Sequence, residues 1–79
     1  MKTILITGAA GQIGSELTPA LRKVYGNDNV VASDIRADVK EELKTDGPYE
    51  VIDCLDVKRI ADIVKKYNID TIYNLAALL

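Results

Sequence analysis

The chain contains no histidine and a single cysteine, Cys54, among its 79 residues. These absences exclude disulfide frameworks, paired-cysteine redox or zinc motifs, histidine-based catalytic triads and the usual zinc sites, because each needs a histidine or at least two cysteines. A lone thiol fits a reducing compartment better than an oxidising one. The sequence therefore predicts a cytoplasmic protein.

Long apolar runs and blocks of like charge are also missing. Only three strongly apolar residues stand together before Thr7, too few for a signal-peptide core, and no run approaches the roughly 20 residues of a membrane helix. Ten Lys and Arg against twelve Asp and Glu give a net charge of −2 without a basic block. We therefore expect a soluble protein of one small domain at most, with neither nucleic acid nor membrane as a partner.

Apolar runs alternate along the chain with segments of helical periodicity. Strands are predicted at 2–7, 29–34, 50–54 and 70–74, and the first helix at 12–25. Pro19 lies inside that helix and predicts a bend or a late start, since proline lacks an N–H and crowds the preceding turn.

The remaining segments are a connection and a second helix. The charged stretch 37–50 contains Gly47 and Pro48 and predicts a solvated connection with a helical turn or two near 39–43. Apolar residues recur at helical spacing in both predicted helices. In the first helix these are Ile13, Leu17, Ala20, Leu21 and Val24, and in the second they are Val57, Ile60, Ala61, Val64 and Tyr67.

Strands that alternate with helices imply a parallel sheet with right-handed crossovers and helices on both faces. The fold class predicted is α/β, a Rossmann-type doubly wound parallel sheet. The chain would supply its N-terminal half, about four strands in the order 3-2-1-4. Residues 75–79 are apolar and lack a turn signal, cap or polar tail, so we expect that this sequence is the first part of a longer protein.

A glycine-rich turn from Gly8 to Gly14 follows the first strand and opens the first helix. Glycine permits positive φ and close approach of a ligand, and a helix N-terminus presents unpaired N–H groups and a positive dipole. An ordinary strand-to-helix turn is the alternative, but three glycines, with Gly11 between the other two, exceed what it needs. A P-loop is excluded because no lysine follows. The turn, with Gln12 and Ile13, predicts a phosphate site.

Asp34 stands twenty positions beyond Gly14, at the end of the second predicted strand. An acidic residue at this distance is expected to hold an adenosine ribose. A carboxylate there accepts hydrogen bonds from the ribose hydroxyls and repels a 2′-phosphate, which favours NAD over NADP. Arg36 could accommodate that phosphate but stands farther from the expected ribose position, and the alternative for Asp34 is a solvated loop acid. The predicted cofactor is NAD.

The segment from Ile4 to Gly14 resembles the TGxxGxxG signature of the extended short-chain dehydrogenase/reductases. Three later segments resemble that family's further cofactor contacts, and the resemblance covers essentially the whole chain. Within the family, the sequence is most similar to prokaryotic L-threonine 3-dehydrogenases of the short-chain type, followed by sugar-nucleotide epimerases and dehydratases. The three segments are Ser33-Asp34-Ile35-Arg36, Leu55-Asp56-Val57 and Asn74-Leu75-Ala76-Ala77.

The resemblance implies roles for residues beyond the glycine turn. Asp56 would meet the adenine amino group and Val57 would pack beside the ring, although Asp56 could equally be the N-cap of the second helix. Small residues near the end would let the cofactor pass close to the backbone; their alternative is the end of a core strand. The remaining implied contacts are Ile35, Arg36, Leu75, Ala76 and Ala77.

Catalysis in this family uses a tyrosine followed four positions later by a lysine. The positions four after the chain's tyrosines hold Asn29, Asp53, Thr71 and Ala77, so no such pair exists. We expect no catalytic residue and no metal site in this chain. Residues 1–79 are interpreted as the N-terminal portion of an NAD-binding Rossmann domain, without the catalytic and substrate-binding parts.

The resemblance implies that the intact protein oxidises L-threonine to 2-amino-3-oxobutanoate with NAD and is a homodimer. Only the intact protein would meet its small-molecule substrate, and the 79 residues alone are expected to be inactive. One alternative is an NAD-dependent sugar-nucleotide epimerase or dehydratase. Another is a stand-alone, non-catalytic dinucleotide-binding module. Continuation of the reading frame into Tyr-x-x-x-Lys would favour the enzyme, and a stop codon the module.

Overall fold

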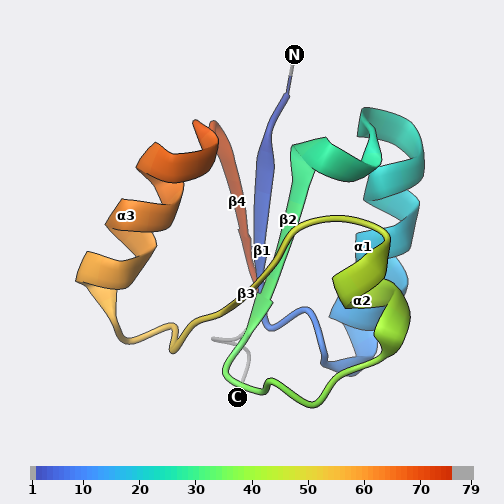
Figure 1. Cartoon of the computed structure of the whole chain (residues 1–79), viewed down its shortest axis with the longest axis horizontal. Helices are drawn as coiled ribbons and strands as arrows, with labels where there is room; N and C mark the ends of the chain where they lie inside the picture. Colours follow the sequence, from blue (N-terminus) through green and yellow to red (C-terminus); the bar gives the residue numbers. More distant parts are fainter. Residues whose placement is uncertain (1, 76–79) are drawn as a thin grey trace.

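The computed structural model describes residues 2–75 as a parallel sheet between helices (Figure 1). The strand order is β3-β2-β1-β4, which confirms the predicted order and the Rossmann-type fold class. In chain order the elements are β1 (Ile4–Thr7), α1 (Gln12–Tyr25), the 3₁₀ helix η1 (Asn27–Asn29), β2 (Val30–Asp34), α2 (Glu41–Thr45), β3 (Tyr49–Val51), α3 (Val57–Tyr67) and β4 (Thr71–Asn74).

The central strand β1 pairs in parallel with β2 and β4. Thr7, its last residue, lies opposite Ser33 of β2 and Asn74 of β4. The three strands therefore end almost level, at the edge of the sheet where β1 runs into the glycine turn. In open parallel sheets, ligands bind at this carboxyl edge.

Side chains alternate between the two faces of the sheet, and each face has its own helices. In Figure 1, α1 and α2 lie on one side of the sheet and α3 on the other. The core toward α1 and α2 contains Ile4, Ile6, Val30, Ala32 and Leu43. The core toward α3 contains Leu5, Val31, Ile52 and Ile63. Burial of β1 and most of β2 on both faces explains their continuous apolar sequence.

Helix α1 begins at Gln12 and continues through Pro19 to Tyr25, so the predicted late start is wrong. Its buried residues are Gly14, Thr18 and Arg22, spaced four apart along one face. The apolar residues Ile13 and Val24 are instead 59% and 73% exposed. The close approach of Gly14 to the turn rotates the helix so that an adjacent face, rather than the most apolar one, meets the sheet.

Helix α3 is rotated in a similar way relative to its apolar pattern. Ile63 is buried against the sheet, with Ile60 and Tyr67 beside it. Val57 is 76% exposed and Ala61 is exposed, although both share the predicted helical spacing. The periodicity therefore predicted the helix correctly but placed its buried face inaccurately.

The segment between β2 and α3 differs from the prediction in the bounds of its elements. Helix α2 occupies Glu41–Thr45, and β3 is limited to Tyr49–Val51 instead of 50–54. The strand ends early because Asp53 makes a local turn, in which its side chain accepts a hydrogen bond from the Leu55 N–H at 2.9 Å.

Arg22 ties α1 to the segments around it. Its guanidinium is buried and donates hydrogen bonds to the carbonyl oxygens of Val30 at 3.2 Å, Leu43 at 3.1 Å and Pro48 at 2.8 Å. A Cβ on Gly47 would lie only 2.7 Å from Nε of Arg22. Burial lowers the pKa of Arg22, and the negative charge of Asp46 partly opposes this change.

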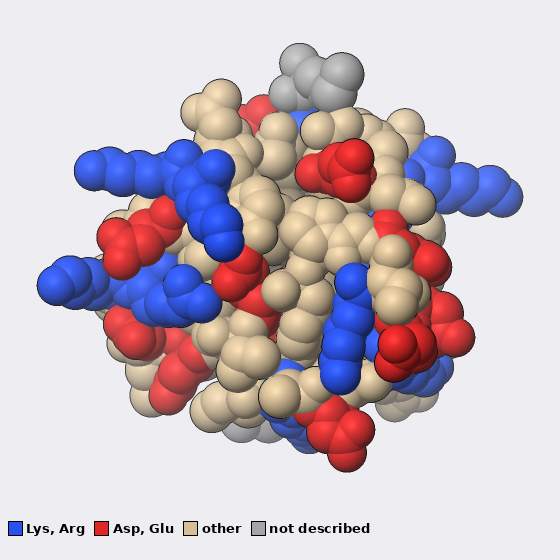
Figure 2. All heavy atoms as spheres, in the orientation of Figure 1, with Lys and Arg blue, Asp and Glu red and all other residues tan. Residues whose placement is uncertain are grey.

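Acidic and basic side chains are intermixed on the face shown in Figure 2. Among residues 2–75, no helix combines the length and the apolar character needed to cross a membrane.

Candidate cofactor site

The glycine turn is a tight hook between β1 and α1. Gly8 has φ of 76°, a left-handed conformation that favours glycine. The Gly11 N–H donates to the Gly8 carbonyl oxygen at 3.1 Å, and the Ser15 N–H donates to Gly11 at 2.8 Å. Gly11 is thus the N-cap of α1, and the helix begins as soon as the hook closes.

The space for a side chain differs between Gly14 and Gly11. A Cβ on Gly14 would lie 2.4 Å from the Gly8 carbonyl oxygen and 2.7 Å from Cα of Ala9, so the helix packs directly on the backbone of the turn. A Cβ on Gly11 would lie 3.3 Å from the Gly8 oxygen, which is tight but tolerable. Packing therefore requires glycine at position 14 much more strongly than at position 11.

A groove of about 220 Å³ runs over this hook. Its lining consists of the predicted phosphate-site residues and the first residue after β4, namely Gly8, Gly11, Gln12, Ile13, Gly14 and Leu75. No side chain caps the N-terminus of α1, and its first turn carries no acidic residue. The first N–H groups of a helix have no partner within it. The groove therefore offers donors and positive potential to an anion such as a pyrophosphate.

A larger hollow of about 390 Å³ lies between α1 and α2, away from the glycine turn. Its buried cation is Arg22, whose donors are already engaged by backbone carbonyls. We assign the candidate site to the smaller groove, because that groove lies at the N-terminus of α1 and is lined by the predicted phosphate-site residues.

Asp34 connects the end of β2 directly to the glycine turn. Its Oδ2 accepts a hydrogen bond from the Ala10 N–H at 3.1 Å, and its Oδ1 accepts one from the Arg36 N–H at 3.1 Å. The Ala9 N–H also donates to the Ser33 carbonyl oxygen at 2.9 Å. The carboxylate predicted to hold a ribose therefore lies beside the turn predicted to hold phosphate.

The residues after Asp34 form an exposed turn. Ile35 is 64% exposed, and Arg36 is also exposed. The hydroxyl of Tyr49, on the neighbouring strand β3, donates a hydrogen bond to the Arg36 carbonyl oxygen. Burial raises the pKa of Tyr49, the negative charge of Asp34 raises it further, and the positive charge of Arg36 partly opposes both.

Sequence reasoning did not predict the Tyr49 contact. In the sequence, Tyr49 is a tyrosine without a lysine four positions later, and no other pattern distinguishes it. The contact depends on the pairing of β3 with β2, in which Tyr49 lies opposite Ala32. No local sequence pattern specifies that register.

Asp56 is the N-cap of α3, so the structural role predicted as its alternative is confirmed. Its Oδ1 accepts a hydrogen bond from the Arg59 N–H at 3.1 Å. The cap uses only Oδ1, which leaves Oδ2 for another donor. Val57, in the first turn of α3, is 76% exposed and is accessible to a ligand. The adenine contacts of both residues stay predictions.

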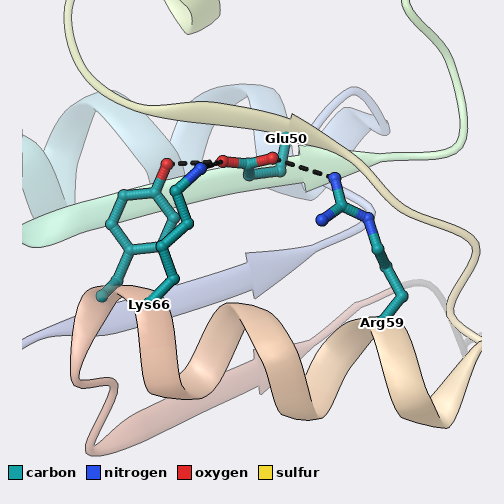
Figure 3. A network of polar contacts seen from close by, with 4 residues as sticks. Glu50, Arg59 and Lys66 are labelled. Atoms are coloured by element: carbon teal, nitrogen blue, oxygen red, sulfur yellow. Dashed lines mark hydrogen bonds and ion pairs between the residues drawn. The ribbon is translucent and has the colours of Figure 1, made fainter.

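Glu50 holds α3 against the edge strand β3 (Figure 3). Its Oε1 lies 3.1 Å from the Arg59 guanidinium and its Oε2 lies 3.1 Å from the Lys66 ammonium, while the Tyr67 hydroxyl donates to Oε2. Burial alone would raise the pKa of Glu50, but the bonds from Tyr67, Lys66 and Arg59 outweigh it and hold the pKa below its usual value. Both ends of α3 are thus tied to one carboxylate.

The last predicted contacts lie at the end of β4. The Thr7 hydroxyl donates a hydrogen bond to the Asn74 side-chain oxygen at 2.7 Å, and the Leu75 N–H donates to the Thr7 carbonyl oxygen at 3.0 Å. These bonds bring Leu75 to the groove. Ala76 and Ala77 lie outside the described residues.

Comparison with known proteins finds relatives whose sequences match the whole of this chain. An uncharacterized epimerase/dehydratase of Staphylococcus saprophyticus is 47% identical over 79 residues, which are 100% of this chain and 25% of that protein. The structure of L-threonine dehydrogenase from Clostridium difficile is similar, with a TM-score of 0.88 at 54% identity. The match covers 100% of this chain and 25% of the dehydrogenase chain.

A structure with bound cofactor is also similar. It is UDP-glucose-4-epimerase from Stenotrophomonas maltophila with bound NAD and formylated UDP-arabinopyranose, with a TM-score of 0.81 at 25% identity. The match covers 100% of this chain and 25% of the epimerase chain. The chain spans about a quarter of the length of these relatives. The sequence profile of the NAD dependent epimerase/dehydratase family matches residues 4–79. The chain therefore belongs to the NAD dependent epimerase/dehydratase family.

Proposed function

We propose that this chain is the NAD-binding N-terminal segment of an oxidoreductase that oxidises L-threonine to 2-amino-3-oxobutanoate with NAD. The observation that carries the cofactor part is the 3.1 Å hydrogen bond from the Ala10 N–H to Asp34. This bond sets a ribose-binding carboxylate next to a glycine turn that opens a helix, which is the arrangement a dinucleotide needs.

Each part of the site has a separate role in this proposal. The N–H groups at the start of α1 bind the pyrophosphate, and the absence of a side chain at Gly11 leaves room for it. Asp34 accepts hydrogen bonds from the adenosine ribose, with Ile35 and Arg36 beside it. Asp56 and Val57 meet the adenine, while Leu75, Ala76 and Ala77 line the path toward the nicotinamide. When bound, NAD supplies a hydride acceptor.

The proposal predicts that NAD binds in preference to NADP. A 2′-phosphate would place like charge beside the Asp34 carboxylate, and the expected penalty is about tenfold or more in Kd. Calorimetry of the chain with each dinucleotide measures the difference. Equal or tighter binding of NADP would remove the role of Asp34, and no binding of either dinucleotide would remove the cofactor part of the proposal.

The threonine part is supported by the 54% identity to the Clostridium difficile L-threonine dehydrogenase. It is tested with the protein translated from the complete reading frame, in which NADH formation is followed with L-threonine as substrate. Formation of NADH that is lost in the Asp34→Ala variant is the expected result. A protein that binds NAD but leaves L-threonine unchanged would overturn the substrate assignment alone.

A second candidate is an NAD-dependent sugar-nucleotide epimerase or dehydratase. It is favoured by the likeness to UDP-glucose-4-epimerase and by the name of the staphylococcal relative. The same protein incubated with UDP-glucose, with sugar products separated by chromatography, distinguishes it from a threonine dehydrogenase. A stand-alone dinucleotide-binding module would bind NAD and convert neither substrate. Homodimer formation and a cytoplasmic location stay predictions.

A further inference from the structure

We propose that Tyr49 is a positioning residue for cofactor selection, because its hydroxyl fixes the turn that directs Asp34, rather than Arg36, toward the ribose. The inference rests on the proposed NAD binding and deepens it.

A continuous set of hydrogen bonds leads from β3 to the glycine turn. The Tyr49 hydroxyl donates to the Arg36 carbonyl oxygen. The Arg36 N–H donates to Asp34 Oδ1 at 3.1 Å, and the Ala10 N–H donates to Asp34 Oδ2 at 3.1 Å. The peptide groups on both sides of Arg36 are therefore held, and both oxygens of Asp34 are oriented.

Packing does little to hold this turn in place. Ile35 is 64% exposed, and residues 36–38 are exposed. The turn does not belong to a helix or strand, because β2 ends at Asp34. Polar contacts must therefore determine its conformation, and the Tyr49 hydroxyl supplies one that comes from outside the turn, at the Arg36 carbonyl oxygen. Tyr49 itself is anchored, since its ring packs against the core on the α1 side of the sheet.

The conformation of this turn bears on selectivity because it carries two opposite charges two positions apart. Asp34 repels a 2′-phosphate and Arg36 attracts one. Selectivity therefore depends on which of the two side chains faces the 2′ position of the ribose. With the Arg36 backbone held by Tyr49 and by Asp34, the carboxylate stays beside the glycine turn. Release of the Arg36 carbonyl would free the guanidinium to approach a phosphate.

The test is Tyr49→Phe, which keeps the ring and removes only the hydroxyl. We expect the Kd for NAD to rise about three- to tenfold, the usual effect of one hydrogen bond, while the Kd for NADP stays level or falls. The double variant Tyr49→Phe/Arg36→Ala should lose any gain in NADP affinity. Tyr25→Phe is the matched control, because its ring packs against the same core and both Kd values should stay unchanged.

A readout without ligand separates positioning from general stability. In Tyr49→Phe, amide hydrogen exchange of Arg36 and Ala10 should accelerate while that of Leu5 in the central strand stays protected. If the parent chain binds NAD and Tyr49→Phe keeps the same ratio of NAD to NADP affinity, the role of Tyr49 is overturned and the proposed function stands. If the parent chain binds neither dinucleotide, the proposed function fails first and the selection role fails with it.

Discussion

Gly14 packs directly against Gly8 across the glycine turn, so closely that a Cβ on Gly14 would lie 2.4 Å from the Gly8 carbonyl oxygen. The fold itself therefore requires the last glycine of the motif, because α1 could not approach β1 with a side chain there. Gly11 is less constrained, since its added Cβ would lie 3.3 Å from the same oxygen, which is tight but tolerable. Under the proposed function, one motif thus combines a packing requirement at Gly14 with a binding requirement at Gly11.

This difference predicts opposite consequences for two alanine variants. Gly14→Ala should destabilise the chain by about 1–3 kcal/mol, the usual cost of overpacking, and should lower the urea midpoint. Gly11→Ala should fold with nearly the parent stability but bind NAD at least tenfold more weakly, because the methyl group enters the space of the pyrophosphate. Urea unfolding and calorimetry of both variants measure the two effects. Parent-like NAD binding by folded Gly11→Ala would show that the turn is not a phosphate site.

Glu50 should give the stability of the chain a measurable dependence on acid pH. Its folded-state pKa is lowered below 4.5, so its stabilising contribution is present above the unfolded-state pKa and is lost as pH falls through the folded-state pKa. At pH 7, Glu50→Gln should cost about 1–2 kcal/mol. The difference from the parent should shrink as the pH falls below the usual pKa of a glutamate, as measured by urea unfolding at successively lower pH.

Salt provides a second test of the Glu50 contacts. Arg59 and Lys66 are 42% and 59% exposed, so added salt should reduce their part of the effect. Glu16→Gln serves as the control, because Glu16 is an exposed residue of α1 and should change stability little. A cost for Glu50→Gln that stays constant as the pH is lowered through the acid range would contradict the charge-dependent role.

Arg22 should not tolerate replacement by lysine. Lysine offers a compact ammonium group in place of the planar guanidinium and cannot reach all the carbonyl oxygens that Arg22 now contacts, so buried acceptors lose their partners. We expect Arg22→Lys to lower the unfolding free energy by about 2–4 kcal/mol, measured by urea denaturation. The neighbouring Lys23→Arg is the control, since Lys23 is exposed. Equal stability of the two variants would refute the tethering role.

Asp56 allows capping and adenine recognition to be separated. Asp56→Ala should lose about 1 kcal/mol of stability, because it removes the acceptor for the Arg59 N–H, whereas Asp56→Asn should retain most of the cap. If Oδ2 also meets the adenine amino group, Asp56→Asn should still weaken NAD binding. An asparagine whose oxygen caps the helix places its NH₂ group, which cannot accept a hydrogen bond, toward the adenine amino group. Urea unfolding and calorimetry read the two roles independently. Parent-like NAD binding by Asp56→Asn would leave Asp56 as an N-cap alone.

The sequence alone was sufficient to predict the order of elements, the parallel sheet and the residues of the glycine turn. These features follow from local information. The apolar run of β1 specifies a strand buried on both faces, and the glycines specify a tight turn. The twenty positions from Gly14 to Asp34 span most of α1, the short 3₁₀ helix η1 and β2. Right-handed crossovers then leave few arrangements of the strands.

Contacts between distant segments were decided only by the tertiary structure. Close packing at Gly14 set the rotation of α1, so that Arg22 is buried while the apolar Val24 is exposed. The pairing of β3 with β2 brought Tyr49 to the turn after Asp34, and the same edge strand placed Glu50 between the two ends of α3. Periodicity describes each element separately, whereas the rotation of a helix and the register of strands depend on which side chains meet across the whole fold.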